Sequence, residues 1–200
     1  MDLDPKDLVD RAADARKEAR AARLNAAVAV TVAVLATFMG ICKVKDDNIV
    51  QAMQQAQADK LDHWAYYQAR TVRADVAEAA VTQLELARAG AAPAQAPAYD
   101  QAIASARAKA ADQLKKRDEL KAQAEADQQA YDALNYRDDQ FDLSDALLAI
   151  AIALLAVTAL TKLWPLFFVS LVPTFFGVLM GVAGLAALPI HPDSLIKLLS

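Results

Sequence analysis

The sequence predicts an all-α protein with three transmembrane helices and a long extramembrane antiparallel helical hairpin. Hydrophobic residues make up 56% of the 200-residue chain, which is high for a soluble protein of this size. Alanine occurs 47 times and glycine only 5 times, a composition that favours long helices over strands. Three stretches without charge, 24–42, 146–161 and 163–190, approach or exceed the roughly 20 residues that a membrane-crossing helix needs.

These stretches divide the chain into three predicted parts. Residues 1–47 hold an N-terminal helix and the first span, 48–141 form the extramembrane hairpin, and 142–200 hold the second and third spans. Lys162 to Pro165 predict a tight turn between the last two spans, with Lys162 and Trp164 at the level of the lipid head groups. The final residues, 191–199, predict a short amphipathic helix on the membrane surface.

The predicted hairpin turns between Arg88 and Pro97, where Gly90 and two prolines end helices. The turn lies midway between the first and second spans, as an antiparallel pair with equal arms requires. We expect a slender coiled coil because the apolar positions are mostly small. Those of the outgoing arm are Ile49, Met53, Ala56, Leu61, Ala65, Ala69, Val72, Val76, Ala79 and Leu86. Those of the return arm are Ile103, Ala106, Ala110, Leu114, Leu120, Ala124, Tyr131 and Leu134.

A row of small residues follows the N-terminal helix in unbroken steps of three and four. Its members are Ala12, Ala15, Ala19, Ala22, Ala26, Ala29, Ala33, Ala36 and Gly40. Asp4 and Pro5 suit an N-cap and a first helical position, so one helix is predicted to run from Pro5 through the membrane. Small residues let helices in lipid approach closely, and the second span has a similar row at Ala146, Ala149, Ala153 and Ala156.

The second span could cover this row within the membrane, but nothing in the chain can cover Ala12 to Ala22. We therefore expect a second copy to do so and predict a homo-oligomer. In the third span Gly177 and Gly181 form a further close-contact motif. The alternative is that alanine is simply abundant and that the row arose by chance.

Four carboxylates are expected to meet near the membrane surface: Asp46, Asp47, Asp142 and Asp145. They could bind a divalent cation through oxygen ligands. Helix capping is the favoured interpretation, since Asp47 and Asp142 suit cap positions. Asp145 lies nearest to the hydrocarbon and would be the first residue to test for a role in transport.

An aromatic cluster in the outgoing arm is the most unusual local string: His63, Trp64, Tyr66, Tyr67 and Arg70. These residue types are common anchors of protein interfaces, so a partner-docking patch is one interpretation. The other is that the bulky rings fill space where the helices splay near the membrane. A metal site is not expected, because one histidine does not supply enough ligands.

Charge and composition exclude several functions. The net charge of −4 indicates no basic surface that would bind nucleic acid. One cysteine and two histidines provide few side chains suited to catalysis. We expect no enzyme activity, no cofactor and no metal. Basic residues before the first span outnumber those on the opposite side, which favours a cytoplasmic N-terminus and a periplasmic hairpin. The 23 residues before the first span include six acidic side chains, which indicates an uncleaved anchor.

Three strings in the outgoing arm resemble a known family. They are Asn48-Ile49-Val50-Gln51-Ala52, Gln55-Ala56-Gln57-Ala58-Asp59, and the segment from Asp62 to Val72 that contains Trp-Ala-Tyr-Tyr-Gln-Ala-Arg. This pattern is similar to the bacterial membrane family called domain of unknown function 4337. The resemblance implies one span, a helical middle and a closing pair of spans, and it implies no activity. Many relatives have a His-rich N-terminus that this chain lacks.

The expected function is therefore structural: a scaffold of the bacterial inner membrane that forms a homo-oligomer and contacts lipids. Two alternatives stay open. One is an oligomeric pore or transporter whose path is lined by Thr31, Thr37, Thr158, Thr161 or Asp145. The other is an accessory subunit docked to a larger membrane protein complex.

Overall fold

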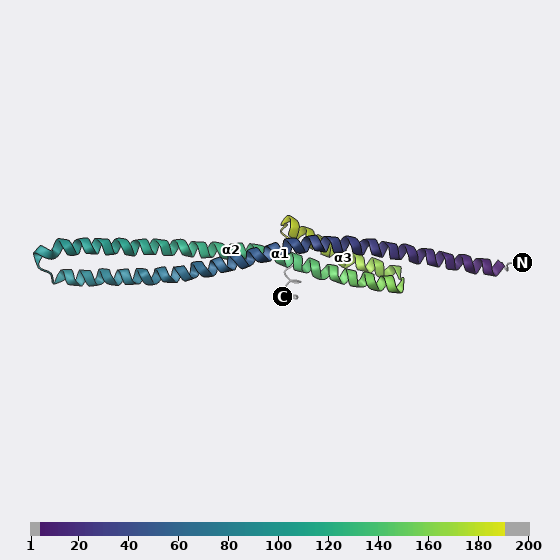
Figure 1. The fold of residues 1–200 in the computed structure, drawn as a ribbon, viewed down its shortest axis with the longest axis horizontal. Coiled ribbons are helices and arrows are strands. Elements are labelled where there is room, and N and C mark those ends of the chain that lie inside the picture. The colour runs from purple at the N-terminus through teal and green to yellow at the C-terminus, as the bar shows by residue number, and fades with distance from the viewer. Residues whose placement is uncertain (1–4, 191–200) are drawn as a thin grey trace. The chain divides into compact units, whose positions relative to one another are not determined.

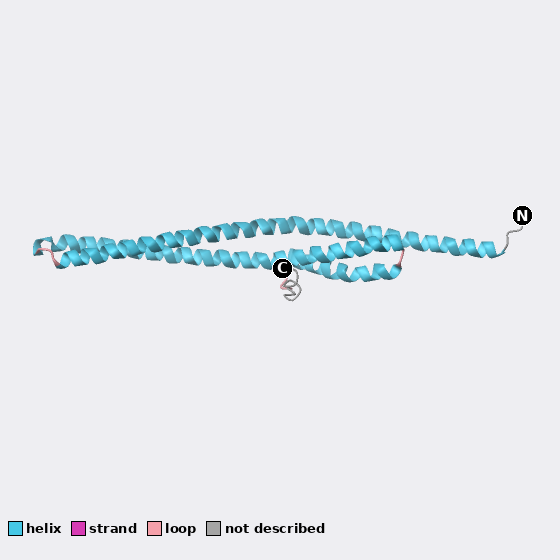
Figure 2. Cartoon of the chain, turned by 90° about the horizontal axis from the view of Figure 1, so that it is seen from below, coloured by secondary structure: helices cyan, strands magenta, loops and turns pink. Residues whose placement is uncertain are grey.

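The computed structural model describes residues 5–190, which form three long helices and one short one (Figure 1). Helix α1 is Pro5–Ala89, the short 3-10 helix η1 is Pro93–Gln95, α2 is Ala96–Thr161 and α3 is Trp164–Ala186. No strand occurs among the described residues, as Figure 2 shows, so the predicted all-α class is confirmed. The predicted tail helix at 191–199 and the Asp4 cap lie outside the described residues.

Helix α1 is continuous over 85 residues. It begins at Pro5, as predicted, and no proline follows until residue 93. The alanine-rich composition favours helix throughout, so no residue near the membrane boundary interrupts it. The first span and the outgoing arm therefore belong to one helix.

The chain divides into two compact units. The first combines Met1–Val50 with Asn135–Ser200, and the second is Gln51–Leu134. The predicted first and third parts thus share one unit, because the spans at the two ends of the chain pack together. The predicted middle part corresponds to the second unit, apart from a few residues at each of its ends.

The first unit contains the three helical segments that are apolar and long enough to cross a membrane. Its core is a cluster of fully or almost fully buried side chains from α1 and α2: Leu24, Val28, Leu35, Leu148, Ala151 and Leu155. Side chains of α3, among them Trp164 and Phe167, pack against this cluster. The chain is thus compatible with a membrane protein of three spans.

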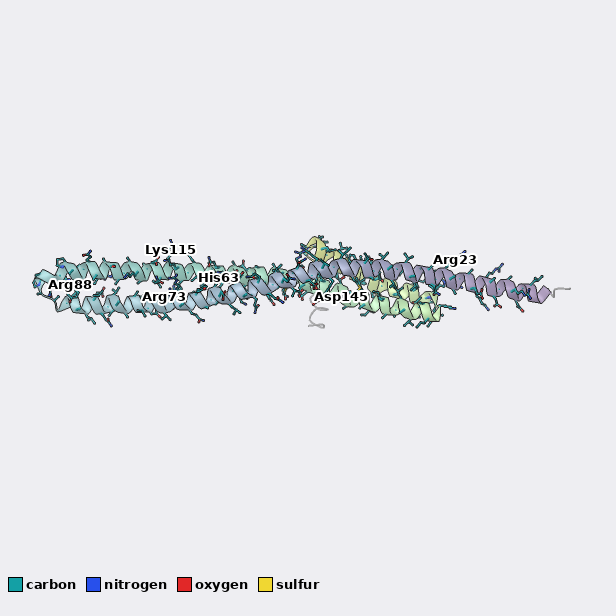
Figure 3. All side chains as sticks on the ribbon, viewed as in Figure 1. Arg23, His63, Arg73, Arg88, Lys115 and Asp145 are labelled. Carbon is teal, nitrogen blue, oxygen red and sulfur yellow. The ribbon has the colours of Figure 1, made fainter. Side chains whose placement is uncertain are left out.

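In the second unit α1 and α2 are joined by hydrogen bonds between side chains. Lys60 bonds Gln128, Arg70 bonds Gln113 and Arg88 bonds Asp100. The partner's number falls as the α1 number rises, so the two helices are antiparallel here. Figure 3 shows His63, Arg73 and Arg88 along the α1 side of this unit and Lys115 on α2. Coiled-coil packing in the strict sense stays a prediction.

The return arm faces α1 with the predicted residues, from Ile103 to Leu134, all of which are buried or half-buried. The outgoing arm does not follow its prediction beyond Ala56. Its inner positions, in steps of three and four, are Met53, Ala56, Lys60, His63, Tyr67, Arg70, Ala74, Ala77, Val81 and Leu84. The predicted inner residues Leu61, Ala65, Ala69, Val72, Val76, Ala79 and Leu86 are exposed. The inner face of this arm therefore combines polar side chains with apolar ones, and the predicted apolar face beyond Ala56 is the exposed one.

Both predicted turns are present. Gly90 and Ala91 follow the end of α1, and Pro97 lies in the first turn of α2, where its missing N–H has no cost. Lys162 takes the left-handed conformation, with φ of 56°, between α2 and α3. Pro165 occupies the first turn of α3, so it begins that helix.

Candidate functional site

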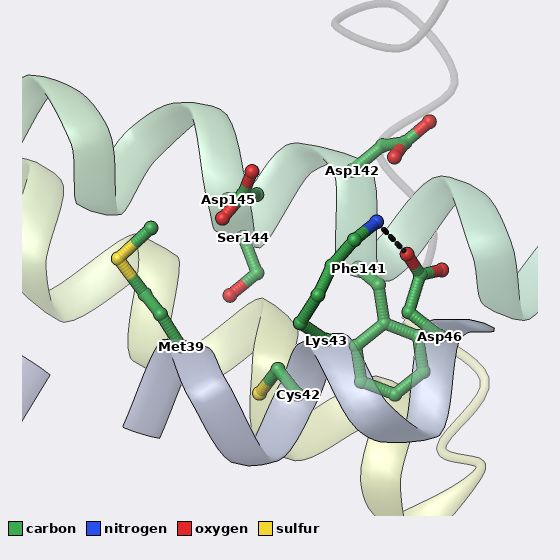
Figure 4. Close-up of a pocket in the computed structure, with 8 residues that line it drawn as sticks. All are labelled: Met39, Cys42, Lys43, Asp46, Phe141, Asp142, Ser144 and Asp145. Atoms are coloured by element: carbon green, nitrogen blue, oxygen red, sulfur yellow. Dashed lines mark hydrogen bonds and ion pairs between the residues drawn. The ribbon is translucent and has the colours of Figure 1, made fainter. Parts of the chain in front are cut away.

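A cluster of charged groups in the first unit lies where α1 and α2 leave the apolar segments. Lys43 and Asp46 of α1 and Asp142 and Asp145 of α2 line a small cavity of about 20 Å³ (Figure 4). Three of the four carboxylates expected to meet are therefore brought together. The fourth, Asp47, is exposed and lies 3.5 Å from the Lys43 ammonium group.

Asp46 is the buried member of this cluster, with 4% of its surface exposed. The Lys43 Nζ donates a hydrogen bond to Asp46 Oδ2 over 2.8 Å, and this bond raises the pKa of Lys43. Asp46 Oδ1 is also buried, and no amide, hydroxyl or cationic donor among the described residues bonds it. A neighbouring carboxyl group that carries a proton could donate a hydrogen bond to this oxygen.

A carboxyl group that sequence reasoning missed, that of Asp138, lies within hydrogen-bond reach of Asp46. Burial raises the pKa of Asp138 from 3.8 to about 7, helped by a hydrogen bond to Asp46 and by the charge of Asp142. Burial, followed by the charge of Asp46, also raises the pKa of Asp142. The signal in the sequence was the spacing: Asp138, Asp142 and Asp145 lie four and three residues apart, on one face of a helix.

Helix capping by Asp47 and Asp142 is wrong, because both residues lie inside continuous helices far from any terminus. Divalent-cation binding was the alternative. Within residues 5–190 no group of three or more histidine, cysteine or acidic side chains has the arrangement of a metal site. What the cluster can do chemically is share a proton between two carboxyl groups.

Three polar residues of α2 attach the cluster to α3, and sequence reasoning missed all of them. The Arg137 guanidinium group donates to the Gly184 carbonyl, and the Gln140 amide donates to the carbonyls of Leu188 and Ile190. The Gly184 carbonyl lies in the last turn of α3, and the carbonyls of Leu188 and Ile190 follow the helix. All three therefore lack an N–H partner within the helix. One turn further on, the Ser144 hydroxyl donates to the Gly177 carbonyl over 2.7 Å.

The glycines of α3 serve contacts within the chain. A Cβ at Gly177 would lie 2.8 Å from the Leu148 side chain, and one at Gly181 would lie 2.7 Å from the Phe38 ring. Both glycines therefore act in helix packing, as predicted. Their expected role toward a second copy is corrected, because α1 and α2 of the same chain already occupy this face.

The alanine row of α1 has the opposite environment. Every member from Ala12 to Gly40 is exposed, and a Cβ at Gly40 would meet nothing within 4 Å. The expectation that the second span covers part of this row is wrong, since α2 and α3 contact the face that holds Leu24, Val28 and Leu35. Ala149, Ala153 and Ala156 of the second span are exposed too. The core contacts between α1 and α2 in this unit are made mostly by leucines, and not by the two alanine rows.

The aromatic cluster lies largely against α2. His63 Nδ1 lies 2.6 Å from Asp127 Oδ2, Arg70 bonds Gln113 over 2.8 Å, and Tyr67 is half-buried. The rings of Trp64 and Tyr67 pack edge to face at 5.3 Å. Tyr66 is the exposed member of the five, with 61% of its surface accessible to solvent. Four of the five side chains are therefore half-buried within the second unit, and partner docking stays a prediction.

The threonines proposed to line a pore are engaged with their own helices. Thr31, Thr37, Thr158 and Thr161 each donate a hydrogen bond to the carbonyl four residues earlier. Such bonds satisfy the hydroxyl group without a neighbour or a water path. None of these threonines thus gives support to a polar path.

The match with known proteins is at the level of a family. The family model described as "Domain of unknown function (DUF4337)" matches residues 24–187, which include all three spans and the whole hairpin. No curated protein and no solved structure matches the chain. Since this match covers most of its length, the chain belongs to the family of domain of unknown function 4337.

Proposed function

We propose that this chain is a structural protein of the bacterial inner membrane, which assembles with copies of itself through the outward face of α1. The observation that carries the proposal is the exposure of the whole alanine row, from Ala12 to Gly40. The row lies on a face of α1 that neither α2 nor α3 contacts.

Helices in lipid have no hydrophobic drive to associate, so they depend on close van der Waals contact. Small side chains permit that contact, and Gly40, with nothing within 4 Å of its Cβ position, leaves room for a neighbouring backbone. A row of nine small residues in steps of three and four therefore suits a second helix. Two copies of α1 would present the same surface to each other, as a symmetric dimer requires.

Exposed apolar side chains elsewhere on α1 agree with this. Leu8 and Val9 precede the first span and are 51% and 67% exposed. In the second unit Val72, Val76 and Leu86 are 61%, 65% and 72% exposed, on the side of α1 away from α2. Apolar surface of this kind on a water-exposed helix favours a protein neighbour.

The proposed role is that of a scaffold or spacer, without catalysis, cofactor or nucleic acid. Its partners would be membrane lipids and copies of the chain, and a larger membrane complex is the competing assembly. The N-terminus would lie in the cytoplasm and the hairpin in the periplasm, because basic residues are more frequent before the first span than after it. Labelling a cysteine placed at Ala94 in intact cells, in a Cys42→Ser background, with a membrane-impermeant reagent tests this orientation.

The assembly is tested by measuring the mass of the purified chain in mild detergent. We expect an oligomer that dissociates when Ala29→Leu and Ala33→Leu add bulk to the row. The matched control is Val34→Phe, which adds bulk to an exposed span residue off the row. A monomer at every concentration, or equal dissociation in the control, would contradict the proposal. Co-purification of a fixed set of other proteins with a monomer would favour the accessory-subunit alternative.

A further inference from the structure

Three basic side chains converge beside the turn between α2 and α3. Lys17 and Arg20 come from α1, and Lys162 comes from the turn. Together with Ala21, Leu163, Trp164 and Pro165 they line a hollow of about 370 Å³. Segments more than 140 residues apart in the sequence thus contribute to one basic pocket.

The pocket lies where lipid head groups would be. Arg20 precedes the first residue of the first apolar stretch, Leu24, by one helical turn, and Lys162 separates the second stretch from the third. Trp164 forms one wall and packs against the buried cluster around Leu24. Tryptophan and lysine at such positions are typical of the membrane interface.

The charge of the pocket is largely uncompensated. Arg20 and Lys162 form no ion pair among the described residues, and no acidic side chain lines the hollow. Lys17 has a contact with Asp14 at 3.7 Å, but both side chains are more than 70% exposed. Such an exposed pair contributes little, so all three cations are free to turn toward an anion.

We propose that this pocket binds the phosphate group of an anionic phospholipid, whose acyl chains lie along the apolar segments of α1 and α3. Basic pockets between transmembrane helices bind head groups of this class, and each cation near the surface contributes about 1 kcal/mol. The wall formed by Leu163 and Trp164 would contact the upper part of the lipid. The proposal needs the chain to lie in a membrane and is independent of its oligomeric state.

The test uses the full chain in mild detergent and native mass spectrometry. Phosphatidylglycerol is the probe, phosphatidylcholine is the neutral control and inorganic phosphate is the competitor. We expect the chain to retain phosphatidylglycerol in preference to phosphatidylcholine. The variant Lys17→Gln/Arg20→Gln/Lys162→Gln should lower the affinity for phosphatidylglycerol about a hundredfold, the product of about fivefold for each charge.

A matched variant, Arg11→Gln/Lys45→Gln/Arg73→Gln, removes the same charge from exposed positions outside the pocket and should bind as the parent does. Lys162→Arg, which keeps the charge, should also bind as the parent does. Unchanged helical circular dichroism shows that the variants are folded. If millimolar inorganic phosphate displaces the lipid, the pocket recognises phosphate itself and the lipid chains add little. Equal loss in both triple variants, or no preference for phosphatidylglycerol, would overturn the proposal.

Discussion

His63 and Asp127 lie 64 residues apart in the chain, yet His63 Nδ1 is 2.6 Å from Asp127 Oδ2. On either side of this pair Lys60 bonds Gln128 and Arg70 bonds Gln113. The middle of the interface between the two arms is therefore polar. Polar groups in such an interface find partners in one register only, so these bonds select the pairing of the arms at some cost in hydrophobic stability.

Asp127→Ala should lower the stability of the second unit by about 1 kcal/mol, because His63 loses its partner across the interface. Hydrogen exchange of amides in residues 51–134 of the full chain measures the change. Glu125→Ala, which removes an exposed carboxylate two residues away, is the control and should have little effect. A double-mutant cycle with His63→Ala that gives no coupling energy would show that the pair does not stabilise the hairpin.

The stability of the first unit should fall as pH rises through about 7. Burial and the bond to Asp46 raise the pKa of Asp138 from 3.8 to about 7, so the folded chain holds a proton that the unfolded chain has released. This contribution is complete below pH 4 and is lost as pH passes the higher value. Thermal unfolding at a series of pH values should therefore show a decline in the parent chain and a flatter profile in Asp138→Asn. Asp132→Asn, in the second unit, should leave the decline unchanged.

Gly181→Ala should destabilise the first unit by about 1–3 kcal/mol, since the new methyl group would lie 2.7 Å from the Phe38 ring and 2.8 Å from Ser144 Oγ. Gly90→Ala adds the same group at a position where the nearest atom, the Ala87 carbonyl oxygen, would lie 3.9 Å away. It should change the stability by less than about 1 kcal/mol. Melting temperatures of the two variants in detergent make the comparison. Similar losses in both would mean that α3 does not pack as closely as described.

Gln140→Leu should cost about 1–3 kcal/mol because it removes both hydrogen bonds to the carbonyls of Leu188 and Ile190. Gln140→Glu should cost more, since a carboxylate would set further acceptor atoms against these carbonyls. Thermal unfolding provides the measurement, and Gln123→Leu at an exposed position is the control. If the glutamate variant were as stable as the parent, Gln140 would not hold the end of α3 in this way.

Local signals were sufficient to predict the helices and their ends. Pro5, Gly90, Pro93 and Pro97 act on the backbone beside them, so their effects can be recognised without tertiary contacts. The meeting of Asp46 with Asp142 and Asp145 could be predicted as well, because it follows from two arms of equal length. Capping by Asp47 could not be correct once the helix continued, and that continuity depends on the alanine-rich sequence on both sides of the boundary.

The inner face of the outgoing arm could not be predicted from its own residues. Apolar residues of this arm such as Val72 and Val76 are exposed. Polar residues such as Lys60, His63 and Arg70 face α2 instead. Hydrophobicity identifies faces that avoid water, but it does not tell which neighbour covers each face. The polar side chains turn inward because α2 presents Asp127, Gln128 and Gln113 there, and that pairing depends on residues distant in sequence.

The part of α1 before the first span has a consequence for its order. Residues 8–20 are all exposed, so the hydrogen bonds of the helix itself are their main support. Nucleation is not needed, because the helix is already anchored from Leu24 onward, and elongation from an existing helix is easy. Opening should therefore progress along residues 8–20 toward Leu24, with exchange protection increasing turn by turn in that direction. A molecule that binds to this stretch would suppress its fraying. Part of the binding free energy would then be used to order these residues.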